Sequence, residues 1–183
     1  MPVPADPDFE DLPTDRLRIR RFRTEDAPVF AAYRSDPDVA RYQSWDTFTL
    51  QEAERFVREM ASTHPGIPGE WFQFAVGDPS TDALLGDVAL CVAAADPTRA
   101  EIGFTFAPAN HGQGYATEAV RAVITYAFDR LDVTTVVAIA DARNAPSIAL
   151  LERIGMRQTT TEHVRFKGAW CDEHTYELRK GEG

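Results

Sequence analysis

One stretch of the chain, EIGFTFAPANHGQGYAT from Glu101 to Thr117, constrains the fold more than any other. Residues 101–106 are rich in Ile and Phe, which predicts a buried strand. A proline and an asparagine end that strand, and the tight turn His111–Gly114 follows. A helix is predicted from Tyr115 onward, because apolar residues recur there at helical spacing. A strand, a glycine-rich turn and a helix start direct backbone N–H groups toward one spot, which favours an anion such as phosphate.

Two other glycine-rich phosphate motifs do not match this turn. The P-loop ends in Gly-Lys-Ser/Thr, and the turn contains no lysine. The dinucleotide fingerprint has Gly or Ala where Thr117 stands, and it normally opens the first strand–helix unit of a chain. A loop that only caps a helix is the alternative interpretation.

Length and composition predict one domain. The 183 residues suffice for a substantial core but leave little room for two domains, and a hydrophobic share of 44% is typical of a soluble globule. No apolar run approaches the roughly 20 residues that span a bilayer, and the N-terminus does not resemble a signal peptide. A cytoplasmic protein without a membrane partner is therefore expected.

The charge and the cysteines exclude several classes of function. The net charge of −10 argues against nucleic acid or acidic lipid as a partner. It suits a cationic substrate, because a negative rim raises the local cation concentration, but solubility explains it equally well. Cys91 and Cys171 lie far apart, and the four histidines lack the spacing of metal ligands, so neither a metal site nor a disulfide is expected.

The N-terminal part of the chain predicts a leader and a strand. Residues 1–13 contain four prolines, four acidic residues and no basic one, which predicts an extended, poorly ordered leader. Leu17 and Ile19 then alternate with Arg18 and Arg20, as in a strand with one solvent-exposed face.

Capping residues and periodicity predict the remaining elements. Thr24 would cap a helix that turns Val29, Phe30 and Tyr33 inward. Thr49 and Glu52 form a capping box for the next helix, and Asn144 begins a later one. Further strands are predicted over residues 71–76, 84–92, 101–106, 134–140, 157–166 and 170–178. The first three of these are expected to be antiparallel. One mixed α/β domain over residues 14–180 accounts for the pattern.

Four motifs in a fixed order resemble a known family. The turn HGQGYA at 111–116 matches Gln/Arg-x-x-Gly-x-Gly/Ala, with His111 in place of the commonest first residue. The other three are Thr14-Asp15-Arg16-Leu17, Asn144-Ala145-Pro146-Ser147 and Lys167-Gly168-x-Trp170-x-Asp172. Together they resemble the GNAT superfamily of acetyl-CoA-dependent N-acetyltransferases, and within it the branch that acetylates the N-terminal alanine or serine of ribosomal proteins. The likeness covers about residues 14–179.

The resemblance implies a fold and a co-substrate. The GNAT fold is a mixed α+β architecture, with a mostly antiparallel twisted sheet, a splayed parallel pair at its centre and flanking helices. Acetyl-CoA would bind with its pyrophosphate on the N–H groups of the turn and its thioester arm between the splayed strands. The expected binding residues are Phe106, His111, Gly112, Gln113, Gly114, Tyr115, Ala116, Thr117 and Asn144.

Glu101 and Ser147 are the expected catalytic residues. An amine acceptor arrives mostly protonated, so a base must remove a proton, and Glu101 on the central strand is the best-placed candidate. Alternatively, Glu101 pairs with Arg99 and a water chain removes the proton. The resemblance implies that Ser147 stabilises or protonates the departing thiolate, whereas spacing alone makes it a first-turn residue behind the N-cap Asn144.

The acceptor is the least determined part. Tyr42 and Trp45 would line its cleft, although aromatic residues are more often core. Glu118 is a weaker candidate base, because Arg121 is its natural partner on the helix. The expected reaction is direct acetyl transfer to a primary amine, without a covalent intermediate. The resemblance to the ribosomal-protein branch favours a protein N-terminus as the acceptor. A polyamine or aminoglycoside acceptor and a non-catalytic acetyl-CoA sensor are the alternatives, and a homodimer is a family-level expectation.

Overall fold

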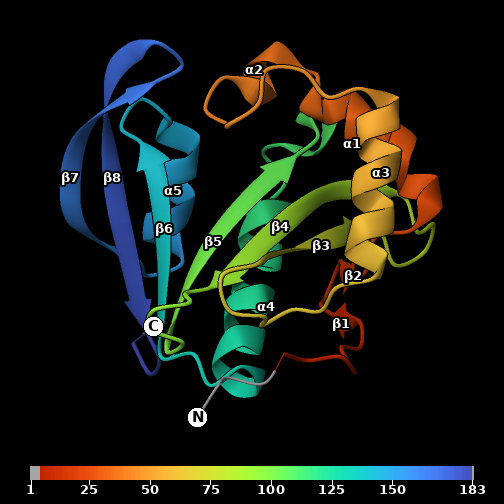
Figure 1. Ribbon diagram of the computed structural model, residues 1–183, viewed down its shortest axis with the longest axis horizontal. Coiled ribbons are helices and arrows are strands. Elements are labelled where there is room, and N and C mark those ends of the chain that lie inside the picture. Colours follow the sequence, from red (N-terminus) through yellow and green to blue (C-terminus); the bar gives the residue numbers. More distant parts are fainter. Residues whose placement is uncertain (1–4, 183) are drawn as a thin grey trace.

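An eight-stranded sheet in the order β1-β2-β3-β4-β5-β6-β8-β7 forms the centre of the protein (Figure 1). The computed structural model describes residues 5–182. The strands are β1 (Leu12–Pro13), β2 (Arg18–Arg20), β3 (Trp71–Gly77), β4 (Leu84–Val92), β5 (Arg99–Phe106), β6 (Thr135–Asp141), β7 (Arg157–Phe166) and β8 (Ala169–Arg179). Neighbouring strands are antiparallel except β5 and β6, which are parallel. The mixed, mostly antiparallel sheet that the motifs implied is confirmed.

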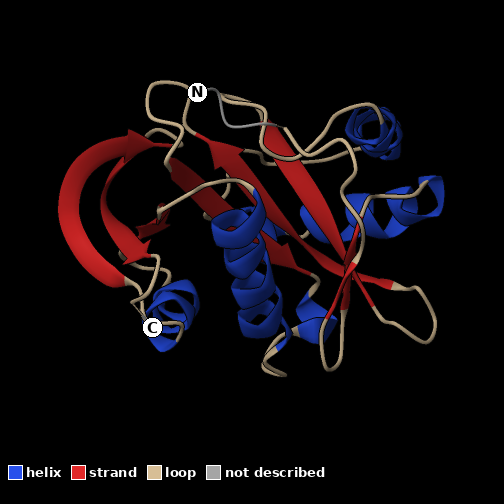
Figure 2. Ribbon diagram, turned by 90° about the horizontal axis from the view of Figure 1, so that it is seen from below, coloured by secondary structure: helices blue, strands red, loops and turns tan. Residues whose placement is uncertain are grey.

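Helices cover both faces of this sheet (Figure 2). On one face lie α4 (Tyr115–Arg130) and α5 (Ala145–Arg153), and on the other lie α1 (Ala27–Arg34) and α3 (Leu50–Ala61). The short helices are η1 (Thr24–Asp26), α2 (Pro37–Ala40) and η2 (Pro108–Asn110). Within residues 5–182, no helix is both long and apolar enough to cross a membrane.

The two parallel strands separate partway along their length. β5 pairs with β6 only over Arg99–Glu101, opposite Thr135–Val137. Beyond that point β5 continues to Phe106 beside β4, whereas β6 continues to Asp141 beside β8. The two strands therefore diverge (Figure 1), which confirms the predicted splay and leaves a gap between their facing edges.

Two apolar clusters hold the helices to the sheet. The larger one packs α4 and α5 against the strands and includes Val120, Val123 and Leu151, each at most 1% exposed. The smaller one joins α1 and α3 around Phe30, whose ring stacks on that of Phe56 at 5.1 Å between centroids. Burying a large apolar side chain stabilises a fold by roughly 1.5–3 kcal/mol before the cost of ordering the chain.

The helix signals in the sequence are confirmed at α3 and wrong at the first helix. Thr49 Oγ1 accepts the N–H of Glu52 at 3.2 Å, and the Glu52 carboxylate accepts the N–H of Thr49 at 2.7 Å. Thr24 was expected to cap the first helix. Instead, a carboxylate oxygen of Asp26 accepts the N–H of Arg23 at 2.7 Å.

The solvent-exposed face expected for β2 is wrong at Arg20, which is 1% exposed. Its guanidinium forms a bidentate ion pair with buried Asp26, at 2.7 and 2.9 Å. The alternation correctly placed the side chains of Arg20 and Ile19 on opposite faces of the sheet. It could not reveal that η1 brings the carboxylate of Asp26 to the face of Arg20. On α1 the inward orientation predicted for Phe30 and Tyr33 is confirmed, because both are buried, whereas the one predicted for Val29 is wrong, because Val29 is 43% exposed.

The described part of the N-terminal leader packs against the domain. Phe9 is 8% exposed and meets Phe74 and Tyr126 edge-on, at 5.2 and 5.4 Å between ring centroids. The hydroxyl of Tyr126 donates to a carboxylate oxygen of Asp6 at 2.8 Å. The expectation of a poorly ordered segment is therefore wrong for residues 5–13, because one aromatic residue anchors it. Residues 1–4 of the leader lie outside the described residues.

Candidate active site

Two glycines with positive φ build the turn between β5 and α4. Gly112 and Gly114 have φ of 72° and 79°, in the left-handed region that favours glycine. Gly114 is the N-cap of α4, and its carbonyl accepts the N–H of Glu118 at 3.1 Å. The N–H groups of residues 115–117 have no acceptor within the helix, and a glycine cap offers them no side-chain oxygen. The predicted strand, turn and helix start are present, and they leave a set of N–H donors at one point.

Arg16 fixes this turn from the N-terminal segment. Its Nη1 donates to the carbonyl of Gln113 at 2.7 Å, and its guanidinium lies over the ring of Tyr115 at 4.8 Å. The carboxylate of Glu118 accepts from both the backbone N–H and the Nε of Arg16, and also from the Thr14 hydroxyl at 2.6 Å. The expected pairing of Glu118 with a helix neighbour is therefore wrong.

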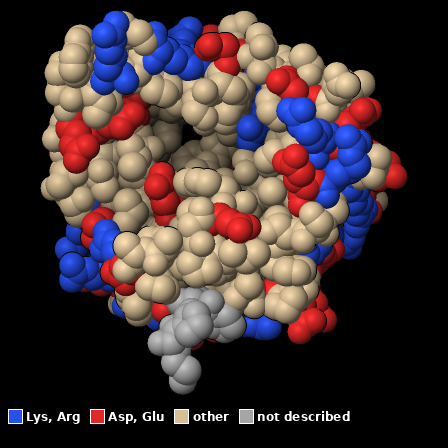
Figure 3. All heavy atoms as spheres, viewed as in Figure 1, with Lys and Arg blue, Asp and Glu red and all other residues tan. Residues whose placement is uncertain are grey.

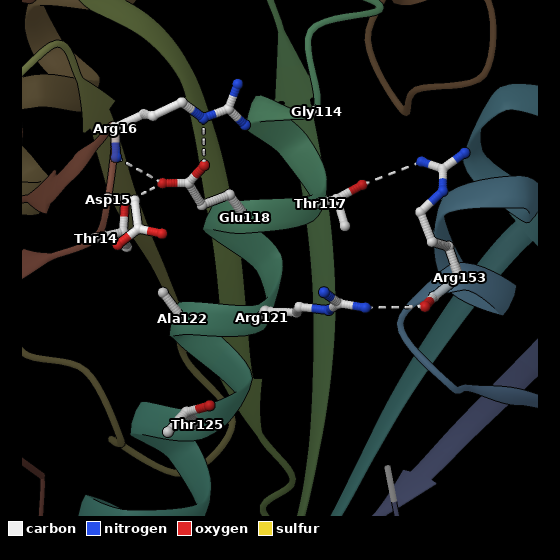
Figure 4. Close-up of a pocket in the computed structure, with 10 residues that line it drawn as sticks. All are labelled: Thr14, Asp15, Arg16, Gly114, Thr117, Glu118, Arg121, Ala122, Thr125 and Arg153. Carbon is white, nitrogen blue, oxygen red and sulfur yellow. Dashed lines mark hydrogen bonds and ion pairs between the residues drawn. The ribbon is translucent and has the colours of Figure 1, made fainter.

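A groove of about 710 Å³ runs along the outer face of α4 (Figure 4). Arg16 borders it on one side and Arg153 of α5 on the other, with Arg121 between them. The guanidinium of Arg121 donates to the carbonyl of Arg153 at 3.0 Å, and that of Arg153 donates to the Thr117 hydroxyl at 3.3 Å. Sequence reasoning missed these arginines, although Arg121 follows Thr117 by one helical turn and so shares its face.

The end of β5 directs some of its backbone groups toward the gap and away from β4. The N–H of Ala107 donates to the carbonyl of Leu85 in β4 at 3.1 Å. The backbone groups of Phe106, the preceding residue, therefore face away from β4. The carbonyl of Phe106 bonds the Nε2 of His111 at 2.8 Å. His111 thus folds its ring back onto β5, while the N–H of Phe106 faces the gap.

Asn144 and Ser147 lie where β6 gives way to α5. The side chain of Asn144 accepts the N–H of Ser147 at 3.3 Å, so its expected role as the N-cap of α5 is confirmed. The hydroxyl of half-buried Ser147 makes no hydrogen bond within the described residues. The side chain that holds the helix start is therefore Asn144, which leaves the Ser147 hydroxyl available.

Glu101 lies at the point where β5 and β6 separate. It is half-buried and opposite Val137 in the last paired position. Burial, and then the nearby carboxylate of Glu173, raise the pKa of Glu101 above its ordinary value. Arg99, the alternative partner, instead bonds Glu177 at 2.5 Å, so the proposed Arg99–Glu101 pair is wrong.

Tyr42 and Trp45 belong to the segment between α2 and α3. The hydroxyl of Tyr42 donates to the carbonyl of Arg143, which precedes α5, at 3.4 Å. The indole Nε1 of Trp45 donates to the carbonyl of Arg34 at 2.9 Å, and its ring lies 3.9 Å from the guanidinium of that arginine. Figure 3 shows a hollow in this face of the molecule, with acidic side chains along its lower edge. Both aromatic residues are half-buried.

A buried polar network lies between α1 and the sheet, and the sequence did not predict it. The carboxylate of Asp87, 1% exposed, accepts from the Tyr33 hydroxyl at 2.5 Å and from the Gln73 amide at 3.0 Å, and it lies 3.5 Å from Nη2 of Arg34. Burial and this carboxylate raise the pKa of Tyr33 well above its ordinary value. The four residues come from β4, α1 and β3, so no local spacing marks them.

Known proteins resemble this chain in sequence and in fold. The model of the acetyltransferase (GNAT) domain matches residues 16–157. The uncharacterized N-acetyltransferase p20 of Bacillus licheniformis is 30% identical over 176 residues, which cover 95% of this chain and 98% of that protein. A GNAT-family acetyltransferase from Bacillus anthracis has a TM-score of 0.83 at 27% identity, covering 94% of this chain and 100% of that one. A candidate ribosomal-protein-serine acetyltransferase from Vibrio cholerae has a TM-score of 0.75 at 27% identity, covering 94% and 98%.

The splayed parallel pair, the glycine-rich turn and these relatives define an acyltransferase. The chain belongs to the GNAT family of N-acetyltransferases. The family resemblance seen in the sequence is confirmed, and two of its motifs, at 111–116 and 144–147, follow the two strands that border the gap.

Proposed function

We propose that the protein transfers an acetyl group from acetyl-CoA to a primary amine, by direct attack of the amine nitrogen on the thioester carbonyl. One observation carries the proposal: N–H donors at the start of α4 adjoin a gap between two splayed strands. The donors suit the diphosphate of CoA, and the gap suits its extended thioester arm. Membership of the GNAT family supports the same co-substrate.

The groove along α4 supports a nucleotide with several phosphates. Arg16, Arg121 and Arg153 line it, in a chain whose net charge is −10. Guanidinium groups beside a helix N-terminus favour phosphate, through charge and through paired N–H donors. We assign the backbone N–H groups of residues 111–117 to the diphosphate. We assign the backbone N–H of Phe106 and the side chain of Asn144 to the thioester arm.

Three residues carry the proposed chemistry. Acetyl-CoA supplies an activated acyl group: the C–N bond forms as the C–S bond breaks. Glu101 accepts, directly or through water, the proton that the nitrogen loses, and its raised pKa makes it a stronger base than an ordinary glutamate. The N–H of Phe106 donates to the carbonyl oxygen as negative charge builds there, and the Ser147 hydroxyl donates to the departing sulfur.

The α-amine of a protein N-terminus is the proposed acceptor. The name of the Vibrio cholerae relative, at 27% identity, supports it. The half-buried carboxylates Glu101 and Glu173 on the open face favour a cationic acceptor. The same carboxylates favour the second candidate, a polyamine or aminoglycoside.

An assay for free CoA thiol across a panel of amines tests the proposal. The panel contains N-terminal peptides, spermidine and an aminoglycoside, and we expect the peptides to be acetylated fastest. Acetyl-CoA should also raise the melting temperature as mass action requires. A wild-type protein that millimolar acetyl-CoA does not stabilise would contradict the proposal.

Two glycine variants separate the turn from backbone strain. Gly114→Asp brings a negative charge to the proposed phosphate site and a Cβ within 3.2 Å of Arg16, so it should abolish stabilisation by acetyl-CoA. The control is Gly168→Asp. Gly168, in the β7–β8 turn, has a comparable φ of 81° and open space where a Cβ would lie. This variant imposes similar backbone strain without the charge at α4, so it should keep the stabilisation.

A further inference from the structure

The tip of the β7–β8 hairpin is tied to the segment between α2 and α3 through one lysine. The Nζ of Lys167 donates to the carbonyls of Ala40 and Trp45, each at 2.7 Å, and pairs with a carboxylate oxygen of Asp46 at 2.8 Å. An ammonium group has three N–H donors, so all three are used. The lysine side chain is only 27% exposed.

This contact spans two parts of the molecule that flank the gap. The hairpin continues the β6 side of the sheet, whereas α2 follows α1 on the β4 side (Figure 1). Lys167 and Trp45 are 122 residues apart in sequence, and no other ion pair joins the hairpin to residues 40–46 within the described chain. The lysine therefore links the β7–β8 hairpin tip to the segment between α2 and α3.

Trp45 is held by contacts with both the β7–β8 hairpin and α1. Its carbonyl accepts from Lys167, while its indole bonds the carbonyl of Arg34 and stacks on that guanidinium. Arg34 is itself 5% exposed and lies in the network of Asp87. Because one contact comes from the hairpin and the other from α1, the orientation of Trp45 depends on both.

We propose that Lys167 is a positioning residue for the acceptor: its ammonium orders residues 40–46 across the gap and thereby sets Trp45 against the incoming amine. This inference rests on the proposed function, because it presumes that the gap is where the amine reacts. Lys167 does not touch the reacting atoms, so its loss should weaken acceptor binding and leave acetyl-CoA binding unchanged.

The turn geometry allows a variant that removes the ammonium and keeps the hairpin. Lys167 has φ of 47° and Gly168 has φ of 81°, so both central residues of this two-residue turn are left-handed. Asn-Gly is the pair such turns favour most, so Lys167→Asn preserves the turn. The matched control is Lys180→Asn. Lys180 is the chain's only other lysine, and it bonds the carbonyl of Phe128 and pairs with Asp129, both at the far end of α4.

Two measurements test the proposal on the full chain. In Lys167→Asn, amide hydrogen exchange over residues 40–46 should accelerate about tenfold or more, since charge-assisted bonds to two carbonyls are lost. The KM for the amine acceptor should rise by about tenfold, with kcat and the KM for acetyl-CoA within about twofold of wild type. Lys180→Asn should change none of these quantities.

Unchanged exchange over residues 40–46, or an unchanged acceptor KM, would overturn the positioning role. A wild-type enzyme without acetyl transfer to any amine would overturn the proposed function and with it the acceptor role. The exchange comparison would still show in that case whether Lys167 orders the segment, so the two failures are distinguishable.

Discussion

The carboxylate of Glu118 accepts two hydrogen bonds from Arg16, from its backbone N–H and from its Nε, each at 2.8 Å. Glu118 lies in the first turn of α4, and Arg16 also donates to the carbonyl of Gln113 in the glycine-rich turn. The pair therefore fixes the turn to the N-terminal segment. A negative charge near the N-terminus of a helix also interacts favourably with the positive end of the helix dipole, so Glu118 stabilises α4.

Glu118→Gln should weaken acetyl-CoA binding. An amide has only one acceptor oxygen, so it can replace one of the two bonds from Arg16, and the turn loses part of its support. We expect the Kd for acetyl-CoA to rise about threefold to tenfold, because Glu118 supports the turn indirectly and only part of the roughly 1.5–3 kcal/mol of a bond to a charged group is lost from binding. Isothermal titration measures the change, and Glu54→Gln on the exposed face of α3 is the control. Equal affinities in wild type and Glu118→Gln would show that the pair does not support the site.

The same substitution should reveal a pH dependence of stability. Burial alone would raise the pKa of Glu118, but the bonds from Thr14 and Arg16 outweigh it and lower the pKa below the ordinary 4.5. A lowered pKa in the folded state stabilises the fold above the unfolded pKa, and this contribution is lost as the pH falls through the folded value. Urea unfolding should therefore show wild type more stable than Glu118→Gln at pH 7, with the difference shrinking below pH 4.5.

Glu101→Gln tests the proposed base. The amide keeps the shape of the side chain but cannot accept the proton, so kcat should fall by roughly 10²–10⁴. Part of the activity should return at high pH, where the amine loses its proton unaided. Acetyl-CoA binding should persist, as a thermal shift would show. A variant with the pH–rate profile of wild type would transfer the role to a water chain.

The stability of Glu101→Gln should change in the opposite sense from that of Glu118→Gln. A raised pKa in the folded state means that the contribution of Glu101 is fully present below the unfolded pKa and is lost as the pH rises through the folded value. The amide avoids this loss. Urea unfolding should find Glu101→Gln more stable than wild type at pH 7 and equal to it near pH 4. Reduced stability at pH 7 would show that the carboxylate has a favourable partner in the fold.

The order of helices and strands could be predicted from the sequence because its signals are local. The mostly apolar run at 84–92 and the capping box at Thr49 depend only on neighbours a few residues away, and the strand and the cap are both present in the structure. The glycine turn was equally readable, because the φ of 79° at Gly114 favours glycine.

The residues that shape the site depend on contacts between distant parts of the chain. Arg16 and Glu118 are 102 residues apart, and Lys167 and Trp45 are 122 apart. Contacts between residues so far apart in the sequence leave no periodic pattern in it. For Glu118, the helix neighbour Arg121 was a plausible but wrong partner. Asp87 was likewise unreadable, because a single acid in an apolar strand does not show which side chains will cover it.

Phe9→Ala should destabilise the fold and thereby test the packing of the N-terminal segment. Phe9 contacts Phe72, Phe74 and Tyr126, so its removal leaves a cavity among aromatic rings. The free energy of unfolding should fall by about 3 kcal/mol or more. Asp8→Ala, at an exposed neighbouring position, is the control and should have little effect. Equal stability of Phe9→Ala and wild type would return residues 5–13 to a loosely attached leader.

Ser147→Ala separates catalysis from helix capping, because the structure divides these tasks between two residues. The cap of α5 is Asn144, whereas the Ser147 hydroxyl has no partner within the described residues. Ser147→Ala should therefore leave the melting temperature nearly unchanged. It should lower kcat by about tenfold or more at unchanged acetyl-CoA affinity, because a donor to the departing sulfur acts in the transition state. Asn144→Ala should instead cost about 0.5–2 kcal/mol of stability. If Ser147→Ala lowers the melting temperature and leaves turnover per folded molecule intact, its hydroxyl supports the helix and takes no part in the chemistry.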